Sequence, residues 1–379
     1  MKKVLILFAT LGASLTLSAQ QPENPEAPKE ARAFTGEYYA TLQSTYTPSF
    51  KIDGSNAKVK NIILLIGDGM GQGAVNAGMF ANGGMLTMTN LRTFGYVRTQ
   101  SADNFTTDSA ASGTAYATGQ KTNNGYLGRD PQKQDLVNIP EKLAPLGFAC
   151  GVLSTDDLNG ATPAAFFAHQ DARNAKEGIW ADLATSCLTY ASAGSQSVYE
   201  SMPLGTQEAI RKEFTVVYDP ADPAVAGSKR LLYLPKTTGD DRGDYLPANT
   251  TNAIEYLAAR SKKGFFLMVE GSSIDDWCHR KKVGYMAEEL FDFDRTIGKV
   301  LKWAEQDGQT LVIVTADHAT GGLTLIDGSL EDRTVKVHFS TKGHNGILVP
   351  VFAYGPHAEA FTGVHENGEV GQIVRSLMK

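Results

Sequence analysis

Five short and almost entirely apolar runs most constrain the fold of this chain. They lie at Ile62–Ile66, Phe148–Leu153, Phe265–Val269, Leu311–Thr315 and Ile347–Ala353. Apolar strands of this length are buried on both faces, which is typical of a parallel sheet. Helical patterns, such as those over 251–259 and 286–305, separate the runs. The sequence therefore predicts an α/β fold, in which a mostly parallel central sheet is sandwiched by helices on both faces.

The size and composition of the chain fit one large domain. Of its 379 residues, 42% are hydrophobic and 20% charged, which excludes a disordered, collagen-like or coiled-coil chain. The net charge is −6 and no long basic run occurs, so no nucleic-acid partner is expected. We expect the folded domain to cover residues 60–379. Within it, residues 188–249 carry turn signals with little periodicity, which predicts an insertion near the site or at a subunit contact.

The first residues have the pattern of an export signal. Lys2 and Lys3 precede an apolar run that ends at Leu17 and is followed by small residues, as in secretory signal peptides. We expect residues 1–19 to be removed on export, either to the periplasm or out of the cell. Residues 20–59 are polar with spaced prolines, which predicts a flexible arm. No stretch reaches the length of a membrane span, so no membrane anchor is expected.

Three cysteines in an exported chain leave one of them unpaired. Cys150 and Cys187 could form a disulfide, with Cys278 free, but sequence spacing does not decide this connectivity. The alternative is that Cys150 and Cys187 are both buried thiols.

Acidic and imidazole side chains follow four of the predicted strands. They are Asp68, Asp156, the acidic residues among 270–276, and the adjacent pair Asp317 and His318. Because ligands of open α/β sheets bind beyond the carboxyl ends of the strands, we expect these groups to meet at one edge. Each alone is more often a turn or surface residue, but their shared placement favours a metal site. Mixed carboxylate and imidazole sets suit zinc, whereas oxygen donors alone suit magnesium.

Ser109 begins a run of small residues that is compatible with a helix. Its place at the predicted helix N-terminus favours anion binding, because the first N–H groups of a helix are unpaired. A serine at this position could instead only cap the helix. No Gly-x-Ser-x-Gly motif surrounds Ser109, and a nearby dication could activate its hydroxyl. The predicted metal site would therefore activate this serine, and the serine in turn gives the predicted metal ions a function.

Six segments closely resemble the sequence motifs of the alkaline phosphatases, in the order of that family. They are Gly67-Asp68-Gly69-Met70-Gly71, Thr107-Asp108-Ser109-Ala110-Ala111-Ser112, Ala161-Thr162-Pro163-Ala164-Ala165, Val269-Glu270-Gly271 with Asp275 and His279, Thr315-Ala316-Asp317-His318-Ala319-Thr320, and Gly343-His344. The resemblance runs from about residue 60 to the C-terminus. It implies the α/β fold of that family and a hydrolase that acts on phosphate monoesters and releases inorganic phosphate.

The resemblance also implies roles for the matched residues. Two zinc ions would be held by two sets of ligands, Asp275 with His279 and His344, and Asp68 with Asp317 and His318. One magnesium ion would be held by Asp68, Thr162 and Glu270. Ser109 matches the nucleophile that forms a seryl-phosphate, and Arg173 matches the guanidinium that binds the phosphate through two N–H groups. Members of the family are often homodimers, which leaves a homodimer open for this chain.

Two positions depart from the pattern of the family. Gly160, two residues before Thr162, stands where an aspartate or histidine is common. Asp276, directly after the matched zinc ligand, stands where lysine, histidine or tryptophan is frequent. The first change concerns the magnesium site, and the second adds a negative charge where the phosphate would bind. Asp276 therefore predicts weaker phosphate binding and faster product release.

Two other functions remain as alternatives. A phosphodiesterase or a sulfatase could use the same fold, but Ser109 lacks the Cys/Ser-x-Pro-x-Arg context of sulfatases. Diesterases of the superfamily usually carry threonine as the nucleophile. A protein that binds phosphate or metal without activity is the second alternative, although every residue required for the chemistry is present. Outside the site, we expect His169 to be a hydrogen-bonded structural residue, and Cys278 to point away from the metals.

Overall fold

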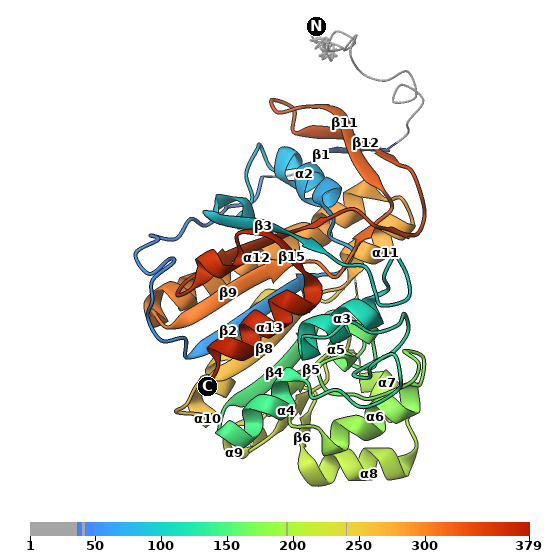
Figure 1. The fold of residues 1–379 in the computed structure, drawn as a ribbon, viewed down its shortest axis with the longest axis vertical. Helices are drawn as coiled ribbons and strands as arrows, with labels where there is room; N and C mark the ends of the chain where they lie inside the picture. The colour runs from blue at the N-terminus through green and yellow to red at the C-terminus, as the bar shows by residue number, and fades with distance from the viewer. Residues whose placement is uncertain (1–35, 40–41, 195, 240) are drawn as a thin grey trace, which may run out of the picture.

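The computed structural model describes residues 36–39, 42–194, 196–239 and 241–379, and its centre is a ten-stranded sheet (Figure 1). In chain order, the strands of this sheet are β2 (Asn61–Gly67), β3 (Thr93–Arg98), β4 (Ala149–Ser154), β5 (Tyr190–Ser192), β6 (Thr215–Val217), β7 (Leu231–Tyr233), β8 (Phe265–Gly271), β9 (Thr310–Thr315), β14 (Val349–Tyr354) and β15 (Gly363–Glu366). Their spatial order is β15-β3-β14-β9-β2-β8-β4-β5-β7-β6. Only β14 runs antiparallel to its neighbours in this described sheet, so the predicted mostly parallel sheet is confirmed.

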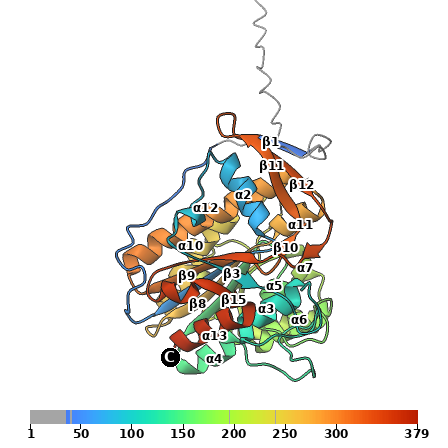
Figure 2. The ribbon, with the colours of Figure 1, turned by 45° about the horizontal axis from the view of Figure 1, so that its top comes forward.

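Helices cover both faces of the sheet. The longest are α10 (Tyr245–Arg260) and α12 (Val283–Asp307), which lie on one face. The opposite face carries α3 (Ser109–Thr118), α4 (Ile139–Leu143), α5 (Ala161–Ala164) and α13 (Asn367–Leu377) (Figure 2). Every residue of β2, β4, β8, β9 and β14 is therefore buried, as their apolar sequences predict. None of the helices in the described ranges is both long and apolar enough to cross a membrane.

Smaller elements surround this sandwich. They are α2 (Gln72–Ala81), α6 (Lys176–Thr185), α7 (Gln196–Glu200), α8 (Leu204–Glu213), α9 (Ala224–Gly227), α11 (Ser273–His279), and the 3₁₀ turns η1 (Met88–Asn90), η2 (Ala144–Leu146) and η3 (Ala358–Phe361). A three-stranded antiparallel sheet contains β1 (Gly36–Tyr39), β12 (Thr334–Phe339) and β11 (Leu323–Ser329), in that order. The short strands β10 (Ala319–Thr320) and β13 (His344–Asn345) pair beside the central sheet.

The segment 188–249 contributes to the central sheet. Its strands β5, β7 and β6 extend the sheet in parallel beyond β4, and each has three residues. The insertion near the site or at a subunit contact stays a prediction, but the little periodicity of this sequence does not mean that its residues lack regular structure. Strands of three residues are too short to produce a periodic pattern, which explains why the sequence did not predict them.

Part of the predicted flexible arm lies against the domain. Tyr46, Phe50 and Ile52 are partly buried and pack on the hydrophobic core. The guanidinium of Arg92 lies 4.0 Å from the centre of the Phe50 ring. The expectation of a flexible arm therefore does not hold for residues 42–59, because apolar side chains among the polar ones anchor this segment. The predicted signal peptide at 1–19 lies outside the described residues.

The three cysteines are unpaired in the structure, so the alternative of buried thiols holds for Cys150 but not for Cys187. Cys150 and Cys278 are buried in the core, and burial raises the pKa of both thiols. Cys187 is partly exposed.

Candidate active site

The predicted metal-binding residues meet at the carboxyl ends of β2, β8 and β9. Asp68 follows β2, Glu270 lies near the end of β8 just before α11, and Asp317 comes two residues after β9. Because β8 and β9 both pair in parallel with β2, their carboxyl ends lie side by side. The sheet topology thus brings together residues that are about 250 positions apart in the sequence.

Asp275, His279 and His344 form a first cluster. One ligand atom from each lies within 4.8 Å of the other two. Oδ2 of Asp275 is 3.0 Å from Nε2 of His279, and Oδ1 is 3.7 Å from Nε2 of His344. Ligands bound at about 2 Å to one zinc ion are separated by similar distances. The i, i+4 spacing predicted for Asp275 and His279 is realised on α11.

Backbone carbonyls determine which ring nitrogen of these histidines faces the cluster. Nδ1 of His279 donates to the carbonyl oxygen of Lys342, and Nδ1 of His344 donates to that of Thr107 at 2.9 Å. A carbonyl oxygen only accepts, so Nδ1 carries the proton and Nε2 has a free electron pair in the neutral ring. Metal-binding histidines are usually held in this way. The sequence did not predict these acceptors, because every residue has a carbonyl group.

His318 lies at the centre of a second cluster. Its Nε2 is 3.4 Å from Oδ1 of Asp68 and 3.2 Å from Oδ2 of Asp317. Both oxygens are buried and have no hydrogen bond among the described residues, whereas Oδ1 of Asp317 accepts the N–H groups of Gly69 and His318. Buried carboxylate oxygens without partners are costly unless a cation offsets them. These residues therefore fit a metal ion.

Asp275 links the two clusters. Its carboxylate also lies within 4.8 Å of ligand atoms of Asp68 and His318. Burial, followed by the charges of Asp317 and Asp275, raises the pKa of Asp68 well above its usual value. Burial acts to raise the pKa of Asp275 as well, but the hydrogen bond from His279 and two nearby imidazoles lower it to about 2. A bound dication would offset the negative charge that collects around Asp68.

A third set of donors contains oxygen atoms only. Glu270 and Thr162 lie next to each other and are buried, yet neither Oε1 of Glu270 nor Oγ1 of Thr162 has a hydrogen bond of normal geometry within the described part of the chain. The other oxygen of Glu270 accepts a hydrogen bond from Ser154. Burial, and then the nearby carboxylate of Asp156, raises the pKa of Glu270 to about 8. Unpartnered oxygen atoms beside buried carboxylates fit a hard cation such as Mg²⁺.

Ser109 is the first residue of α3, as predicted, and its side chain faces the second cluster. Oγ of Ser109 is 3.1 Å from Nε2 of His318. The helix is capped by Asp108, which accepts the N–H of Ala111 at 3.0 Å, so the alternative of Ser109 as the cap does not hold. Arg173 donates to the other carboxylate oxygen of Asp108 at 3.2 Å. This pair places the guanidinium beside the N-terminus of α3.

The segment after Thr162 is not one continuous helix. α5 ends at Ala164, and His169 lies in the turns beyond it. His169 donates from Nδ1 to the carbonyl oxygen of Gly128 at 2.8 Å, and its Nε2 is 2.8 Å from Oε1 of Glu141. The predicted structural role of His169 is therefore confirmed.

Sequence reasoning missed the role of Thr320. Its hydroxyl donates to Asp275, and its Oγ1 is also 3.2 Å from Nδ1 of His318. Thr320 thus contacts a ligand from each of the first two clusters. The residue lies within a matched motif, but no feature of the sequence separates an orienting hydroxyl from one that only ends a strand.

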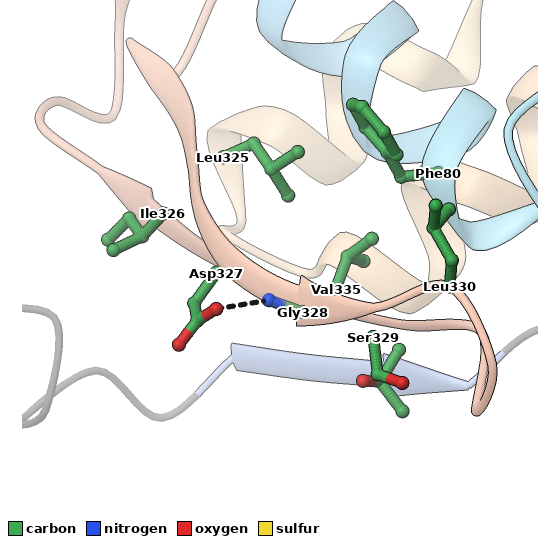
Figure 3. Close-up of a pocket in the computed structure, with 9 residues that line it drawn as sticks. Phe80, Leu325, Ile326, Asp327, Gly328, Ser329, Leu330 and Val335 are labelled. Atoms are coloured by element: carbon green, nitrogen blue, oxygen red, sulfur yellow. Dashed lines mark hydrogen bonds between the residues drawn. The ribbon is translucent and has the colours of Figure 1, made fainter. Parts of the chain in front are cut away.

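A hollow whose lining is more apolar than polar lies between α2 and the β11–β12 hairpin (Figure 3). Its lining consists of Phe80, Leu325, Ile326, Asp327, Gly328, Ser329, Leu330, Thr334 and Val335. The carboxylate of Asp327 accepts the N–H of Gly328 at 2.9 Å. None of the predicted site residues lines this hollow, so the predicted chemistry is not located there.

Known proteins resemble this chain over most of its length. The alkaline phosphatase family model matches residues 59–200, 239–331 and 327–379. The alkaline phosphatase of Escherichia coli (strain K12) is 30% identical over 477 aligned residues, which cover 100% of this chain and 99% of that protein. Alkaline phosphatase 4 of Bacillus subtilis (strain 168) is 32% identical, over 76% of this chain and 67% of that protein.

Solved structures of the same family superpose well on this chain. The alkaline phosphatase of the Antarctic bacterium TAB5 matches with a TM-score of 0.79 and 33% identity. The match covers 85% of this chain and 98% of the TAB5 chain. A mutant of the TAB5 enzyme, with one histidine replaced by glutamate, is described with Mg bound in its M3 site.

Proposed function

Since the chain belongs to the alkaline phosphatase family and is a hydrolase of phosphate monoesters, we propose that Ser109 is its nucleophile, through a seryl-phosphate. The observation that carries this proposal is the position of the Ser109 hydroxyl. It lies at the N-terminus of α3 and 3.1 Å from Nε2 of His318, next to two clusters of metal donors. An anion bound there would meet the unpaired N–H groups of the helix and the guanidinium of Arg173.

We assign two zinc ions and one magnesium ion to the three sets of donors. The zinc ligands are Asp275, His279 and His344 in the first cluster, and Asp68, Asp317 and His318 in the second. The magnesium ligands are Asp68, Thr162 and Glu270. When bound, such cations lower the pKa of a hydroxyl or water and offset the charge of the phosphate. The imidazoles of the first two sets favour zinc, and the oxygen atoms of the third favour magnesium. The magnesium described in the TAB5 mutant supports only that a relative of this chain can hold such an ion.

The residues of the chain then carry the reaction. Arg173 binds two oxygen atoms of the phosphate and holds phosphorus in front of Ser109. Oγ of Ser109 attacks phosphorus, its proton passes to solvent, and the bond from phosphorus to the ester oxygen breaks. The departing alcohol takes a proton from water. A second water attacks the seryl-phosphate and gives a proton to solvent, the bond from Oγ to phosphorus breaks, Oγ takes a proton from solvent, and inorganic phosphate leaves.

The experiment that tests this function compares three chromogenic substrates, a phosphate monoester, a phosphate diester and a sulfate ester. We expect the monoester to be hydrolysed fastest, and both a chelator and Ser109→Ala to remove that activity. Metal analysis of Ser109→Ala is the control, since the substitution removes no proposed metal ligand. Activity of this variant at full metal content would contradict the proposal. Faster hydrolysis of the diester or the sulfate would support the corresponding alternative.

We also propose that the protein is exported, either to the periplasm or out of the cell. The proposal rests on Lys2, Lys3 and the apolar run that follows them. N-terminal sequencing of protein from an exporting cell is expected to show cleavage near Ala19, and an intact Met1 would contradict export. Light scattering on the same sample tests whether the chain forms the homodimer that its resemblance to the family leaves open.

A further inference from the structure

At Gly160, the side chain of another residue fills the space that a side chain of residue 160 would take. Gly160 is the residue before α5 and lies two positions before Thr162, the proposed magnesium ligand. The space that a side chain at position 160 would fill is already occupied. A Cβ added to Gly160 would lie 1.9 Å from Oδ2 of Asp156 and 2.6 Å from its Cγ. The carboxylate of Asp156 therefore stands where Gly160 has no side chain.

Hydrogen bonds of the surrounding turn hold Asp156 in this position. Its N–H donates to Oγ of Ser154 at 2.8 Å, and its Oδ1 accepts the N–H of Asp157 at 2.6 Å. Its carbonyl oxygen accepts the N–H of Gly194 at 2.6 Å. No donor among the described residues is recorded for Oδ2. One carboxylate oxygen is thus fixed by the turn, and the other is available to a ligand.

The carboxylate of Asp156 lies close to the oxygen donors of the proposed magnesium site. Ser154 connects Glu270 to the turn that holds Asp156, since its Oγ accepts the backbone N–H of Asp156 and donates to the carboxylate of Glu270. Oε1 of Glu270 and Oγ1 of Thr162 are buried, and neither has a hydrogen bond of normal geometry to any other described residue. Acidic residues alone do not make a site, but here two buried and unpartnered oxygen atoms accompany them.

We propose that Asp156 supplies the carboxylate that position 160 lacks, and with it holds Mg²⁺, directly or through a water ligand, beside Glu270 and Thr162. This inference rests on the proposed function, because it adds a residue to the same site. Asp156 positions the ion and does not touch the substrate. Oxygen donors of this kind favour Mg²⁺ over zinc.

The test measures Mg²⁺ binding itself, by titration calorimetry on the zinc-loaded full chain. Asp156→Asn keeps the shape of the side chain and removes its charge. We expect it to weaken Mg²⁺ binding roughly 10- to 100-fold, as for residues that support a metal ligand, with the zinc content unchanged. The matched control is Asp157→Asn, which removes a charge from the next residue and is expected to bind Mg²⁺ like the wild type.

A second pair of variants moves the carboxylate to position 160. Asp156→Ala is expected to lose Mg²⁺ affinity, and Gly160→Asp in the same chain is expected to restore part of it. The backbone at Gly160, with φ −63° and ψ 154°, suits aspartate at this position before a helix. With Asp156 shortened, the close contact left for the new Cβ is the carbonyl oxygen of Asp157 at 2.9 Å, which requires a small shift of the turn.

Each outcome decides for or against the inference. Wild-type Mg²⁺ affinity in Asp156→Asn would overturn it, and so would equal losses in Asp156→Asn and Asp157→Asn. A wild-type protein that binds no Mg²⁺ would overturn it too. Thermal unfolding of each zinc-loaded variant shows whether it is folded. The proposed function fails in a different way, by absence of phosphate monoester hydrolysis, and the Mg²⁺ titration does not depend on activity.

Discussion

Two buried clusters of charged side chains differ in how their charges are satisfied. At the carboxyl edge of the sheet, three carboxylates each present a buried oxygen without a hydrogen bond among the described residues: Asp68, Glu270 and Asp317. Beside α12, Arg242 donates to both carboxylate oxygens of Glu289, at 2.9 and 2.6 Å. It also donates two N–H groups to Oδ2 of Asp292, at 3.2 and 2.8 Å. Of these two clusters, only the one beside α12 contains the cation, Arg242, that donates to its buried carboxylates.

This difference separates a structural cluster from a functional one. Arg242 belongs to the segment before α10, and its ion pairs attach that segment to α12. At the carboxyl edge of the sheet, no described side chain donates a hydrogen bond to these three oxygen atoms, so a cation from outside the chain would offset their charge. We therefore expect the carboxylates at the carboxyl edge to weaken the metal-free fold and bound cations to stabilise it. The following predictions test this contrast.

The largest effect on stability is expected at the satisfied cluster. Arg242→Ala leaves Glu289 and Asp292 buried without their shared cation, and breaking a buried ion pair costs about 3–5 kcal/mol. Urea unfolding of the metal-loaded protein measures this loss. We expect the activity of the folded fraction to remain at the wild-type level. A loss of stability below about 1 kcal/mol would place Arg242 among ordinary surface ion pairs and remove the contrast.

A smaller effect, on catalysis alone, is expected for Arg173. The Arg173→Ala variant loses charged hydrogen bonds to phosphate of about 1.5–3 kcal/mol, so kcat/KM falls roughly 10- to 100-fold. Its stability is expected to change little, because the side chain is 42% exposed. Arg173→Lys keeps the charge but not the paired N–H groups, and is expected to recover only part of the activity. Full recovery would contradict binding through two N–H groups.

The metal-free protein is expected to lose stability as pH rises between about 4.5 and about 8. Burial and the Asp156 charge raise the pKa of Glu270 from 4.5 to about 8. The folded state then keeps a proton that the unfolded chain has released, so each unit of pH costs up to about 1.4 kcal/mol for one such group. Thermal unfolding with a chelator measures this slope, and Glu270→Gln is expected to flatten it. A flat profile in the metal-free wild type would show that the carboxylates have partners of their own.

The smallest effect is expected at Asp276. This residue is exposed, and its charge lies next to the proposed zinc ligand Asp275. Asp276→Lys is expected to lower the inhibition constant of inorganic phosphate roughly 2- to 5-fold, as befits an exposed charge. Asp276→Asn serves as the matched control, with a smaller effect in the same direction. An unchanged inhibition constant in the lysine variant would show that Asp276 does not weaken phosphate binding.

The sequence was sufficient to predict those parts of the fold whose residues form a strong local pattern. The five apolar runs become buried strands, because burial on both faces requires apolar residues throughout. The residues that follow these strands were expected to share one edge, and Asp68, Glu270 and Asp317 do so. Strands β5, β6 and β7 were missed, because three residues carry no period and the neighbouring strands stabilise them.

The supporting contacts of the site could not be predicted in the same way. The carbonyl groups of Thr107 and Lys342 orient two histidines, but no residue type distinguishes a carbonyl that does so. The role of Asp156 depends on the space above Gly160, which only the folded turn reveals. The sequence shows both Asp156 and the missing side chain at Gly160, but nothing in it indicates that the two residues share one space.

The most direct test of the central claim is a search for the phosphoryl group on Ser109. The zinc-loaded protein is mixed with a phosphate monoester, quenched in acid, digested, and analysed by mass spectrometry. We expect one phosphoryl group on the peptide that contains Ser109, and none on that peptide in Ser109→Ala. A phosphoryl group on another residue would contradict the account, and so would monoester hydrolysis that Ser109→Ala leaves intact.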